Sequence, residues 1–580
     1  MMQQSRPVSE KCASVLRRFS CMAAALILLF SLPALLPGAS ACTGVYAGSA
    51  VTEDGSVWFG RSEDYGPDYV KHFVIIPAAD HAEGEMFEDD YGFRIPCPAH
   101  TLRYSAVMDD VSNHGGIAKV PYAEAGINEK GVSVTATISI YFNDAVIAAD
   151  PLTDGGITEM SMASFLLQSA ETALDGVKLL TDCIDTWGHG RPEGTGPDYN
   201  ETSAVLIADP NETWLVEIVS GHQYVAVRLS DDTVVVDPNA LLTQQINTAD
   251  GNLIVSPGLI SVAEDGGFLV NDTGEENGIH VARTYSSGYF GSLSYRSYFG
   301  AYILNREIAE AMDPVPRPAA ELADLYPNAS AEVIAAGPFC LEYKPSPDVA
   351  GTIGLMTLRR VLSSHGEGSA YETGRPNESR YNEAIRSIGT YKQNEEHLFE
   401  IRRDETLPAS VATVEWLAFG PTEFSVFIPF YAAAMTRTPD VCTTSSPESF
   451  DPSSLYWVFN EIGDTGNGRY YRLDANGIYR DRYGEEVDPE IAAAVLQFLN
   501  DSCVADRLHD HMTRMQEEII ARFSEDDAQT AALAGSASEE EISALADQLA
   551  ETYCEEIMLF ASEELAQIDR EVAEFCSSAP

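Results

Sequence analysis

The cysteine at position 42 is the residue of this chain best placed to do chemistry. It follows Ala39-Ser40-Ala41, a small-x-small pattern that signal peptidase accepts, so cleavage there would make Cys42 the first residue. An N-terminal cysteine carries its own base, because a free α-amine has a reference pKa of about 7.7 to 8.0 whereas a peptide nitrogen accepts no proton. Cleavage would therefore create a thiol nucleophile together with its proton acceptor.

Two other roles for Cys42 stay open on the local sequence alone. A lipoprotein cysteine also follows a signal peptide directly, but its recognition usually requires a bulky aliphatic residue three places earlier, where this chain has Ala39. Lipidation would alkylate the sulfur and often acylate the amine, which would remove nucleophile and base together. The third role is that of an ordinary disulfide cysteine.

Residues 1–41 have the pattern of a secretory signal peptide. Arg17 and Arg18 precede an apolar run from Met22 to Leu36 that is too short to span a bilayer. No later stretch approaches about 18 apolar residues, so we expect no integral membrane segment once the leader is removed. We therefore expect a protein that is secreted or held at the cell surface.

Composition limits the classes of partner. Removing residues 1–41 leaves 539 residues, enough for one large domain with elaborations or for two to three ordinary domains. The leader contains four of the 35 basic residues and one of the 89 acidic residues, which leaves a mature balance of about −57. Such a surface repels nucleic acid and anionic membranes, so we expect no nucleic-acid partner.

The cysteine pattern gives no sign of a metal site. Eight cysteines remain after the leader, namely Cys42, Cys97, Cys183, Cys340, Cys442, Cys503, Cys554 and Cys576. If Cys42 is a free thiol, an odd number is left, so at least one more stays unpaired. None forms a CxxC pair and no His/Cys spacing resembles a zinc site, so we predict no metal and no cofactor.

The elements around Cys42 predict a β-hairpin. Cys42–Ala50 alternates small and apolar residues as a strand does, and the turn Asp54–Ser56 leads into a second strand at Val57–Gly60. The return strand would bring Arg61 and Asp64 back beside the cysteine. An arginine there can orient a substrate carbonyl or carboxylate, and an aspartate can bond the α-amine or the thiol. The alternative is a surface ion pair beside a turn.

The segment from Cys42 to Gly66, CTGVYAGSAVTEDGSVWFGRSEDYG, resembles the opening of the dipeptidase family of N-terminal-nucleophile (Ntn) cysteine hydrolases, relatives of the bile salt hydrolases and penicillin V acylases. Family members begin Cys-Thr and carry an Asp-Gly-Ser turn followed by Arg-x-x-Asp. AGINEKGVSVTAT, from Ala125 to Thr137, is similar to the family's strand-turn-strand. The helical pattern of Ile157–Trp187 resembles the family's helix over the sheet.

The resemblance continues with one interruption to about residue 500. The turn at Asp209–Glu212 is similar to the family's Asp-x-x-Glu-x-Trp segment, and agreement fades between Thr248 and Asn277. Asn239 stands where related cysteine amidases hold an oxyanion-hole asparagine, although Asp-Pro before it also fits a plain turn. For Arg283 and Arg296 we favour side chains that snorkel from a helix face over carboxylate binding.

The C-terminal part predicts a helical extension over residues 501–580. Helical periodicity covers Pro489–Phe523, small residues at Glu525–Gly535 indicate a linker, and Ser538–Glu541 is a capping box that opens a second long helix. We expect these helices to pack either on the preceding domain or on another copy of the chain in a homo-oligomer.

The resemblance implies an α+β fold, a four-layer αββα Ntn-hydrolase sandwich over residues 42–500, and no cofactor or metal. It also implies acyl transfer by Cys42, with Arg61 on the substrate, Asp64 on the α-amine and Asn239 at the oxyanion. The implied substrates are short peptides, dipeptides above all. One alternative is an amidase of the same fold for conjugated bile acids or N-acyl amides; the other is an inactive surface lipoprotein or binding module lipidated at Cys42.

Overall fold

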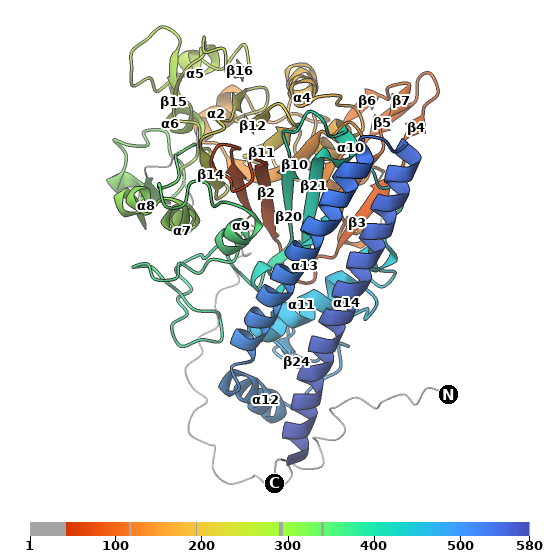
Figure 1. The fold of residues 1–580 in the computed structure, drawn as a ribbon. Helices are drawn as coiled ribbons and strands as arrows, with labels where there is room; N and C mark the ends of the chain where they lie inside the picture. The colour runs from red at the N-terminus through yellow and green to blue at the C-terminus, as the bar shows by residue number, and fades with distance from the viewer. Residues whose placement is uncertain (1–41, 115–118, 193, 289–293, 338–340, 579–580) are drawn as a thin grey trace.

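Two large antiparallel β-sheets form the centre of the computed structural model, which describes residues 42–114, 119–192, 194–288, 294–337 and 341–578 (Figure 1). The six-stranded sheet has the order β14–β1–β2–β20–β21–β22, with strands β1 (Thr43–Ala47), β2 (Val57–Asp64), β14 (Val234–Asp237), β20 (Gln393–Ile401), β21 (Thr413–Phe419) and β22 (Ile428–Phe430). The eight-stranded sheet has the order β16–β13–β12–β11–β10–β9–β8–β3, with strands β3 (Lys71–Ile76), β8 (Tyr104–Asp109), β9 (Ala123–Ile127), β10 (Ser133–Tyr141), β11 (Glu201–Ala208), β12 (Thr213–Ile218), β13 (Tyr224–Arg228) and β16 (Leu253–Val255).

Helices and short ribbons surround these sheets. The helices are α2 (Asp144–Ala149), α3 (Glu159–Leu167), α4 (Ala173–Trp187), α5 (Ser261–Gly266), α6 (Val281–Tyr285), α7 (Ser294–Leu304), α8 (Arg306–Ala311), α9 (Leu355–Leu362), α10 (Ala409–Ala412), α11 (Leu455–Gly466), α12 (Pro489–Asp501), α13 (Val504–Ala534) and α14 (Glu539–Ser578). The two-stranded ribbons pair β4 (Ala79–Asp80) with β7 (His100–Thr101), β5 (Met86–Glu88) with β6 (Arg94–Pro96), β15 (Gln245–Asn247) with β17 (Gly278–His280), β18 (Asp313–Pro318) with β19 (Val333–Gly337), and β23 (Arg472–Leu473) with β24 (Tyr479–Arg480).

The eight-stranded sheet buries both of its faces. In β11, Ala204, Leu206 and Ala208 belong to the core cluster that also contains the apolar residues of the six-stranded sheet. The alternate residues Val205 and Ile207 belong to a second cluster with the apolar residues of α3 and α4. Because successive side chains of a strand point to opposite faces, one face of this sheet meets the other sheet and the other face meets the helices. The chain is therefore a mixed α+β protein.

Polar contacts also cross the space between the sheets. Thr135 Oγ1 of β10 lies 2.6 Å from His397 Nε2 of β20, and Ser105 Oγ of β8 donates to Glu415 Oε2 of β21 at 2.6 Å. At Gly44 of β1, an added Cβ would lie 2.7 Å from Ile138 Cδ1 of β10. The sheets are therefore tightly apposed where β1 begins.

The first predicted hairpin is confirmed. β1 and β2 pair antiparallel, with Thr43 opposite Ser62 and Gly44 opposite Arg61. The strand-turn-strand expected over Ala125–Thr137 is also confirmed, since Gly131 N–H donates to the Asn128 carbonyl at 2.8 Å and β10 follows. Both turns can be predicted from the sequence because their residue types have strong conformational preferences.

The single helix predicted over Ile157–Trp187 is wrong, because the chain forms α3 and α4 with a break between them. The Asn128 side chain donates from Nδ2 to the carbonyls of Leu167 (3.0 Å) and Ala170 (2.8 Å), which replaces helix continuation. Thr172 then caps α4 by accepting the N–H of Asp175 at 3.1 Å. A side chain from a distant turn thus sets this helix boundary.

The C-terminal helices follow the prediction only in part. The linker predicted at Glu525–Gly535 is wrong, because α13 continues to Ala534. The capping box is confirmed: Ser538 Oγ accepts the N–H of Glu541 at 3.3 Å, and Glu541 Oε2 accepts the N–H of Ser538 at 2.8 Å. Figure 1 shows α13 and α14 as a long antiparallel pair beside β20 and β21.

Helix α13 packs on the six-stranded sheet. The ring of Phe523 lies 5.1 Å from that of Trp416 in β21 and 5.5 Å from that of Tyr431, measured between centroids. Gln516 pairs with the backbone of Phe427, accepting its N–H at 2.6 Å and donating to its carbonyl at 3.2 Å. Residues of α12, α13 and α14 belong to the same core cluster as both sheets.

No helix among the described residues is long and apolar enough to cross a membrane.

Replacing Phe523 should destabilise the whole protein. Phe523→Ala should lower the free energy of unfolding by about 3–5 kcal/mol, because it removes a ring that is 5% exposed at the junction of α13 with the sheet. Chemical denaturation of the mature chain measures this change. The control is Leu559→Ala on α14, a side chain that is 62% exposed, which should stay within about 0.5 kcal/mol of the parent. Equal effects of the two substitutions would contradict this packing.

Stability should depend on pH through Glu415. Burial raises its pKa from 4.5 to about 8, so the unfolded chain loses this proton at lower pH than the folded chain. The free energy of unfolding should therefore fall as pH rises from about 4.5 to about 8, with a Glu415 contribution of at most ~1.4 kcal/mol per pH unit.

Glu415→Gln keeps an acceptor for Ser105 and should flatten this dependence. Denaturation curves at a series of pH values test the prediction, with Glu405→Gln as the control because Glu405 is exposed in the loop before β21. A Glu415→Gln protein with the parental slope would rule out a large contribution from this carboxyl.

Candidate active site

Cys42 lies directly before β1, at the point where the two sheets meet. It is 5% exposed. Arg61 of β2 donates from Nη1 to Cys42 Sγ at 2.8 Å, so the return strand of the hairpin places the guanidinium on the sulfur as predicted. The alternative of a surface ion pair is wrong for Arg61, whose side chain is fully buried.

Arg61 belongs to an ion network buried between the sheets, formed by Arg61, Lys71, Glu63, Glu124 and Asp109. Arg61 Nη2 donates to Glu124 of β9. Lys71 Nζ of β3 lies 2.7 Å from Glu63 Oε1 and 2.5 Å from Glu124 Oε1, and it also donates to Asp109. Five ionisable side chains from β2, β3, β8 and β9 thus meet with almost no solvent access.

The two glutamates of the network differ in protonation. Burial and the neighbouring Glu124 carboxylate raise the pKa of Glu63 well above its usual range. Burial acts in the same direction on Glu124, but the charges of Lys71 and Arg61 outweigh it and hold the pKa of Glu124 below its usual range. The negative charge therefore resides on Glu124, the carboxylate that Arg61 contacts.

The thiol is held in its neutral form. Burial raises the pKa of Cys42; the charge of Arg61 opposes this effect, while Glu63 and Asp64 reinforce it. A protonated thiol is a weak nucleophile, so this sulfur needs a base to react.

Asp64, the last residue of β2, offers an unused acceptor. It is fully buried and pairs with Arg386. Burial raises its pKa, and the charges of Arg386 and Arg296 lower it. Its Oδ1 has no hydrogen-bond partner among the described residues. The predicted contact of Asp64 with the Cys42 α-amine stays a prediction.

Asn239 lies two residues beyond β14, the strand that pairs with β1 so that Asp237 stands opposite Gly44. Its φ is +67°, a left-handed conformation that asparagine tolerates better than most residues. Asp237 Oδ1 accepts the N–H groups of Asn239 (3.1 Å) and Ala240 (3.2 Å), which fixes the turn. The buried Nδ2 of Asn239 has no acceptor in the described part of the chain.

Arg296 of α7 joins Cys42 to Asn239, and here the sequence-based expectation of a snorkelling side chain is wrong. The guanidinium is fully buried. Nη1 donates to the carbonyl of Cys42 and to Thr43 Oγ1 (3.0 Å), while Nη2 donates to the carbonyl of Pro238 (2.6 Å) and to Asn239 Oδ1 (2.9 Å). Burial and the charge of Arg386 lower its pKa.

The structure thus gathers the predicted residues, and adds others. Arg61 donates a hydrogen bond to the sulfur of Cys42, and Asn239 is linked to Cys42 through Arg296. Asp64 interacts electrostatically with both Cys42 and Arg296. Sequence reasoning missed Arg296, Lys71 and Glu124. The signal for Arg296 was its place among aromatic residues in SYRSYFG, since an arginine within such an apolar stretch is buried only when its donors are paired.

A group of acids and tyrosines surrounds Tyr141, whose hydroxyl is within electrostatic reach of the Cys42 sulfur. Glu201 begins β11 opposite Tyr141 of β10, and Tyr199 Oη donates to Glu201 Oε2 at 3.1 Å. Glu159 begins α3; burial and the Glu201 charge raise its pKa to about 8. Burial raises the pKa of Tyr141, and the charges of Glu201, Glu159 and Cys42 add to this. No ion pair satisfies Glu159 or Glu201 among the described side chains.

Comparisons with known proteins identify the family. Residues 41–480 match the family model described as Peptidase family C69. The chain is 30% identical over 439 residues to "Probable dipeptidase B" of Streptococcus pyogenes serotype M1, covering 73% of this chain and 78% of that protein. It is 30% identical over 393 residues to "Probable dipeptidase" of Salmonella dublin, covering 67% and 81%.

A solved structure is also similar, that of a mutant conjugated bile acid hydrolase from Clostridium perfringens, with a TM-score of 0.26 and 11% identity over 65% of this chain and 89% of that chain. The family match covers almost the whole range over which the sequence motifs resemble dipeptidases. The chain therefore belongs to peptidase family C69, and it is a hydrolase of peptide bonds.

Proposed function

We propose that this protein is an exported dipeptidase whose nucleophile is Cys42, exposed when the leader is cut after Ala41. One observation carries the proposal: near the sulfur, two buried polar atoms have no hydrogen-bond partner among the described residues. The free acceptor is Asp64 Oδ1 and the free donor is Asn239 Nδ2. An N-terminal ammonium requires an acceptor and a tetrahedral oxyanion requires a donor, so both match what the reaction needs.

The reaction follows from these groups. The free α-amine of Cys42 takes the thiol proton, directly or through a water, and Asp64 stabilises the resulting ammonium. The sulfur attacks the substrate carbonyl, and Asn239 Nδ2 donates to the oxyanion. The ammonium returns its proton to the leaving amine as the C–N bond breaks. Water then attacks the thioester, releasing the acid and restoring the thiol.

Arg61 and Arg296 position the reacting atoms. Arg61 holds Sγ at 2.8 Å, and its charge favours the thiolate as the proton leaves. Arg296 fixes the carbonyl of Cys42 and orients Asn239 by binding its Oδ1, which leaves Nδ2 for the substrate. A single donor of this kind contributes about 2.7–4 kcal/mol to the transition state.

The buried position of Cys42 supports this role over lipidation. A sulfur 5% exposed and bonded to Arg61 has no space for a diacylglyceryl group that must reach a membrane. The stacking of two sheets between helices supports the finer description of the fold as a four-layer αββα Ntn-hydrolase sandwich. The acidic exterior and the leader pattern support a location outside the cell.

The group of Glu159, Glu201, Tyr141 and Tyr199 supports peptides with a free N-terminus as substrates. The acid pair has no basic partner among the described side chains, and tyrosine rings attract cations through their faces. A peptide α-ammonium supplies the missing positive charge, whereas the steroid part of a bile-acid conjugate carries none. The site therefore favours dipeptides over bile-acid conjugates.

Leader removal should switch on activity. Ala41→Pro should block cleavage and leave a folded chain whose dipeptide hydrolysis is at least about 10³-fold slower, because a peptide nitrogen cannot take the thiol proton. Mass spectrometry of the parent protein should show Cys42 as the first residue, unlipidated. Cys42→Ala should be inactive although cleaved, whereas Cys183→Ala, which changes another buried free cysteine, should retain activity. A lipid on Cys42 or an active uncleaved chain would refute the mechanism.

The acid pair should control recognition of the substrate's N-terminus. Glu201→Gln should lower kcat/KM for free dipeptides about 10- to 150-fold, mainly through KM, because it removes a charge worth about 1.5–3 kcal/mol to a bonded ammonium. Glu159→Gln should have a smaller effect at neutral pH, because burial and the Glu201 charge raise the pKa of Glu159 to about 8 and keep its carboxyl mostly protonated. Glu171→Gln, an exposed acid before α4, serves as the control. Steady-state kinetics on free and N-acetylated dipeptides test this, and parental enzyme that hydrolyses both equally well would contradict it.

A further inference from the structure

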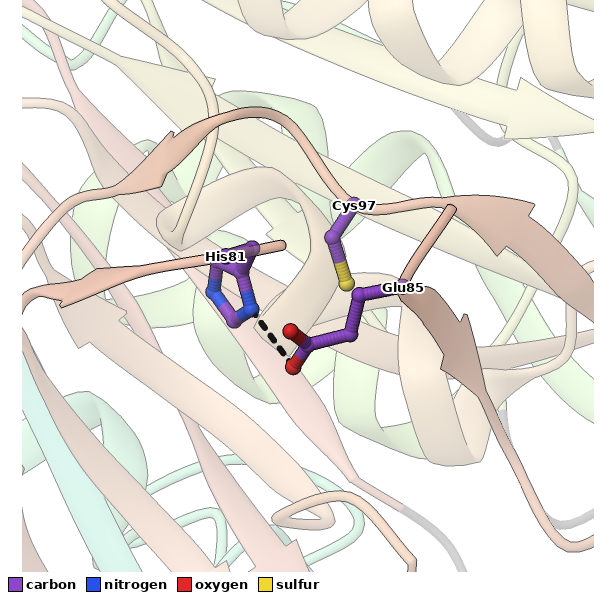
Figure 2. Close-up of side chains that lie close together, drawn as sticks. All are labelled: His81, Glu85 and Cys97. Carbon is purple, nitrogen blue, oxygen red and sulfur yellow. Dashed lines mark hydrogen bonds and ion pairs between the residues drawn. The ribbon is translucent and has the colours of Figure 1, made fainter. Parts of the chain in front are cut away.

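A histidine, a glutamate and a cysteine converge on the ribbon region between β3 and β8, on elements that carry none of the proposed catalytic residues. Figure 2 shows the side chains of His81, Glu85 and Cys97 pointing toward one another, with a hydrogen bond between His81 and Glu85. One ligand atom from each residue, namely a ring nitrogen of His81, a Glu85 carboxylate oxygen and Cys97 Sγ, lies within 4.8 Å of the other two.

The backbone already holds these residues in place. His81 follows β4, and its N–H donates to the Ala99 carbonyl at 3.0 Å. The N–H of Cys97, just after β6, donates to the carbonyl of Glu85 at 2.9 Å. Glu85 Oε2 accepts the N–H of Ala82 at 3.1 Å, which fixes the carboxylate. Side chains attached to such a hydrogen-bonded ribbon lose little further freedom when they bind an ion.

The imidazole is oriented so that Nδ1 faces the other two groups. Thr101 Oγ1 donates to the Ala79 carbonyl at 3.3 Å, which leaves its lone pairs to accept Nε2–H of His81 at 3.0 Å. Nδ1 then lies 2.9 Å from Glu85 Oε1. Two acceptor atoms come this close only when a proton or a cation lies between them. A second hydrogen bond of this kind is the usual support of a metal-bound histidine.

We propose that His81, Glu85 and Cys97 bind a borderline divalent cation such as Zn²⁺, through Nδ1, a carboxylate oxygen and Sγ. The set suits zinc, which takes nitrogen, oxygen and thiolate ligands in tetrahedral geometry. Three protein ligands leave the fourth position to water. Binding displaces the proton between Nδ1 and Oε1 and the thiol proton of Cys97, so two protons are released per ion and binding weakens at low pH.

The other group of close acidic side chains is not a comparable site. Glu63, Glu124 and Glu395 also lie near one another, but Lys71 Nζ and the Arg61 guanidinium already contact the first two. At His81, Glu85 and Cys97 the described neighbours supply no lysine or arginine to the cluster. Cys97 is a free thiol, so its sulfur is available as a ligand.

Metal titration of the mature protein tests the proposal. The background is Cys42→Ser with Cys503→Ser, which removes the proposed nucleophile and the exposed cysteine as competing thiols. Calorimetry with Zn²⁺ should give one ion per chain, and Co²⁺ should produce a thiolate-to-cobalt charge-transfer band in the near ultraviolet. Cys97→Ser should abolish the band, and His81→Ala or Glu85→Gln should weaken zinc affinity at least tenfold.

The matched control is His100→Ala. His100 lies on the neighbouring strand β7 and bonds Asp80 at 2.9 Å, but it belongs to no three-ligand cluster among the described residues, so its loss should leave affinity unchanged. A second test needs no substitution at the site. Zn²⁺ should slow the alkylation of Cys97 at least tenfold, as measured by peptide mapping. Equal alkylation rates with and without zinc, or unchanged zinc affinity in Cys97→Ser, would overturn the proposal.

Discussion

The ion network between the sheets is the interaction on which the rest of the site depends. Buried charges cost several kcal/mol each unless they are paired, and loss of one partner from a buried pair commonly costs 3–5 kcal/mol. Here Arg61 and Lys71 are paired with carboxylates from strands of both sheets. The network therefore ties the sheets together at the depth of Cys42, and it sets the position of the guanidinium that contacts the sulfur. The same ion pairs thus hold the two sheets together and position the side chain that contacts Cys42, the proposed nucleophile.

Asn239 shows how the surrounding structure maintains a strained but useful arrangement. A non-glycine residue at φ +67° is uncommon, and the Asp237 carboxylate stabilises it through two backbone N–H groups. Arg296 then binds the amide oxygen, which settles the orientation of the amide and directs its nitrogen away from protein acceptors. A buried hydrogen-bond donor without an acceptor destabilises the folded protein by about 1–3 kcal/mol, so such a donor usually serves a function.

Local signals predicted the parts of the site that lie close in sequence. The β1–β2 hairpin followed from its turn residues, and it delivered Arg61 because strand pairing fixes register. Features that depend on distant contacts escaped prediction. Arg296 was expected to snorkel, since its partners are backbone carbonyls brought from elsewhere. The end of α3 is set by a side chain 39 residues away in sequence, and the ligand atoms of His81 and Cys97 meet only because two ribbons fold onto each other.

The pairing of β2 with β20 has a consequence for the order in which the molecule is assembled. β2 is made early, but its neighbour in the sheet begins at Gln393, and the Arg386 partner of Asp64 comes 322 residues after it. During synthesis the β1–β2 hairpin therefore has one edge unpaired until most of the chain has been made. Contacts of such long range form slowly, so the surroundings of Cys42 are complete only after the chain has been made as far as Ile401. Until β20 has paired with β2, the hairpin that carries Cys42 lacks the strand that completes its place in the sheet.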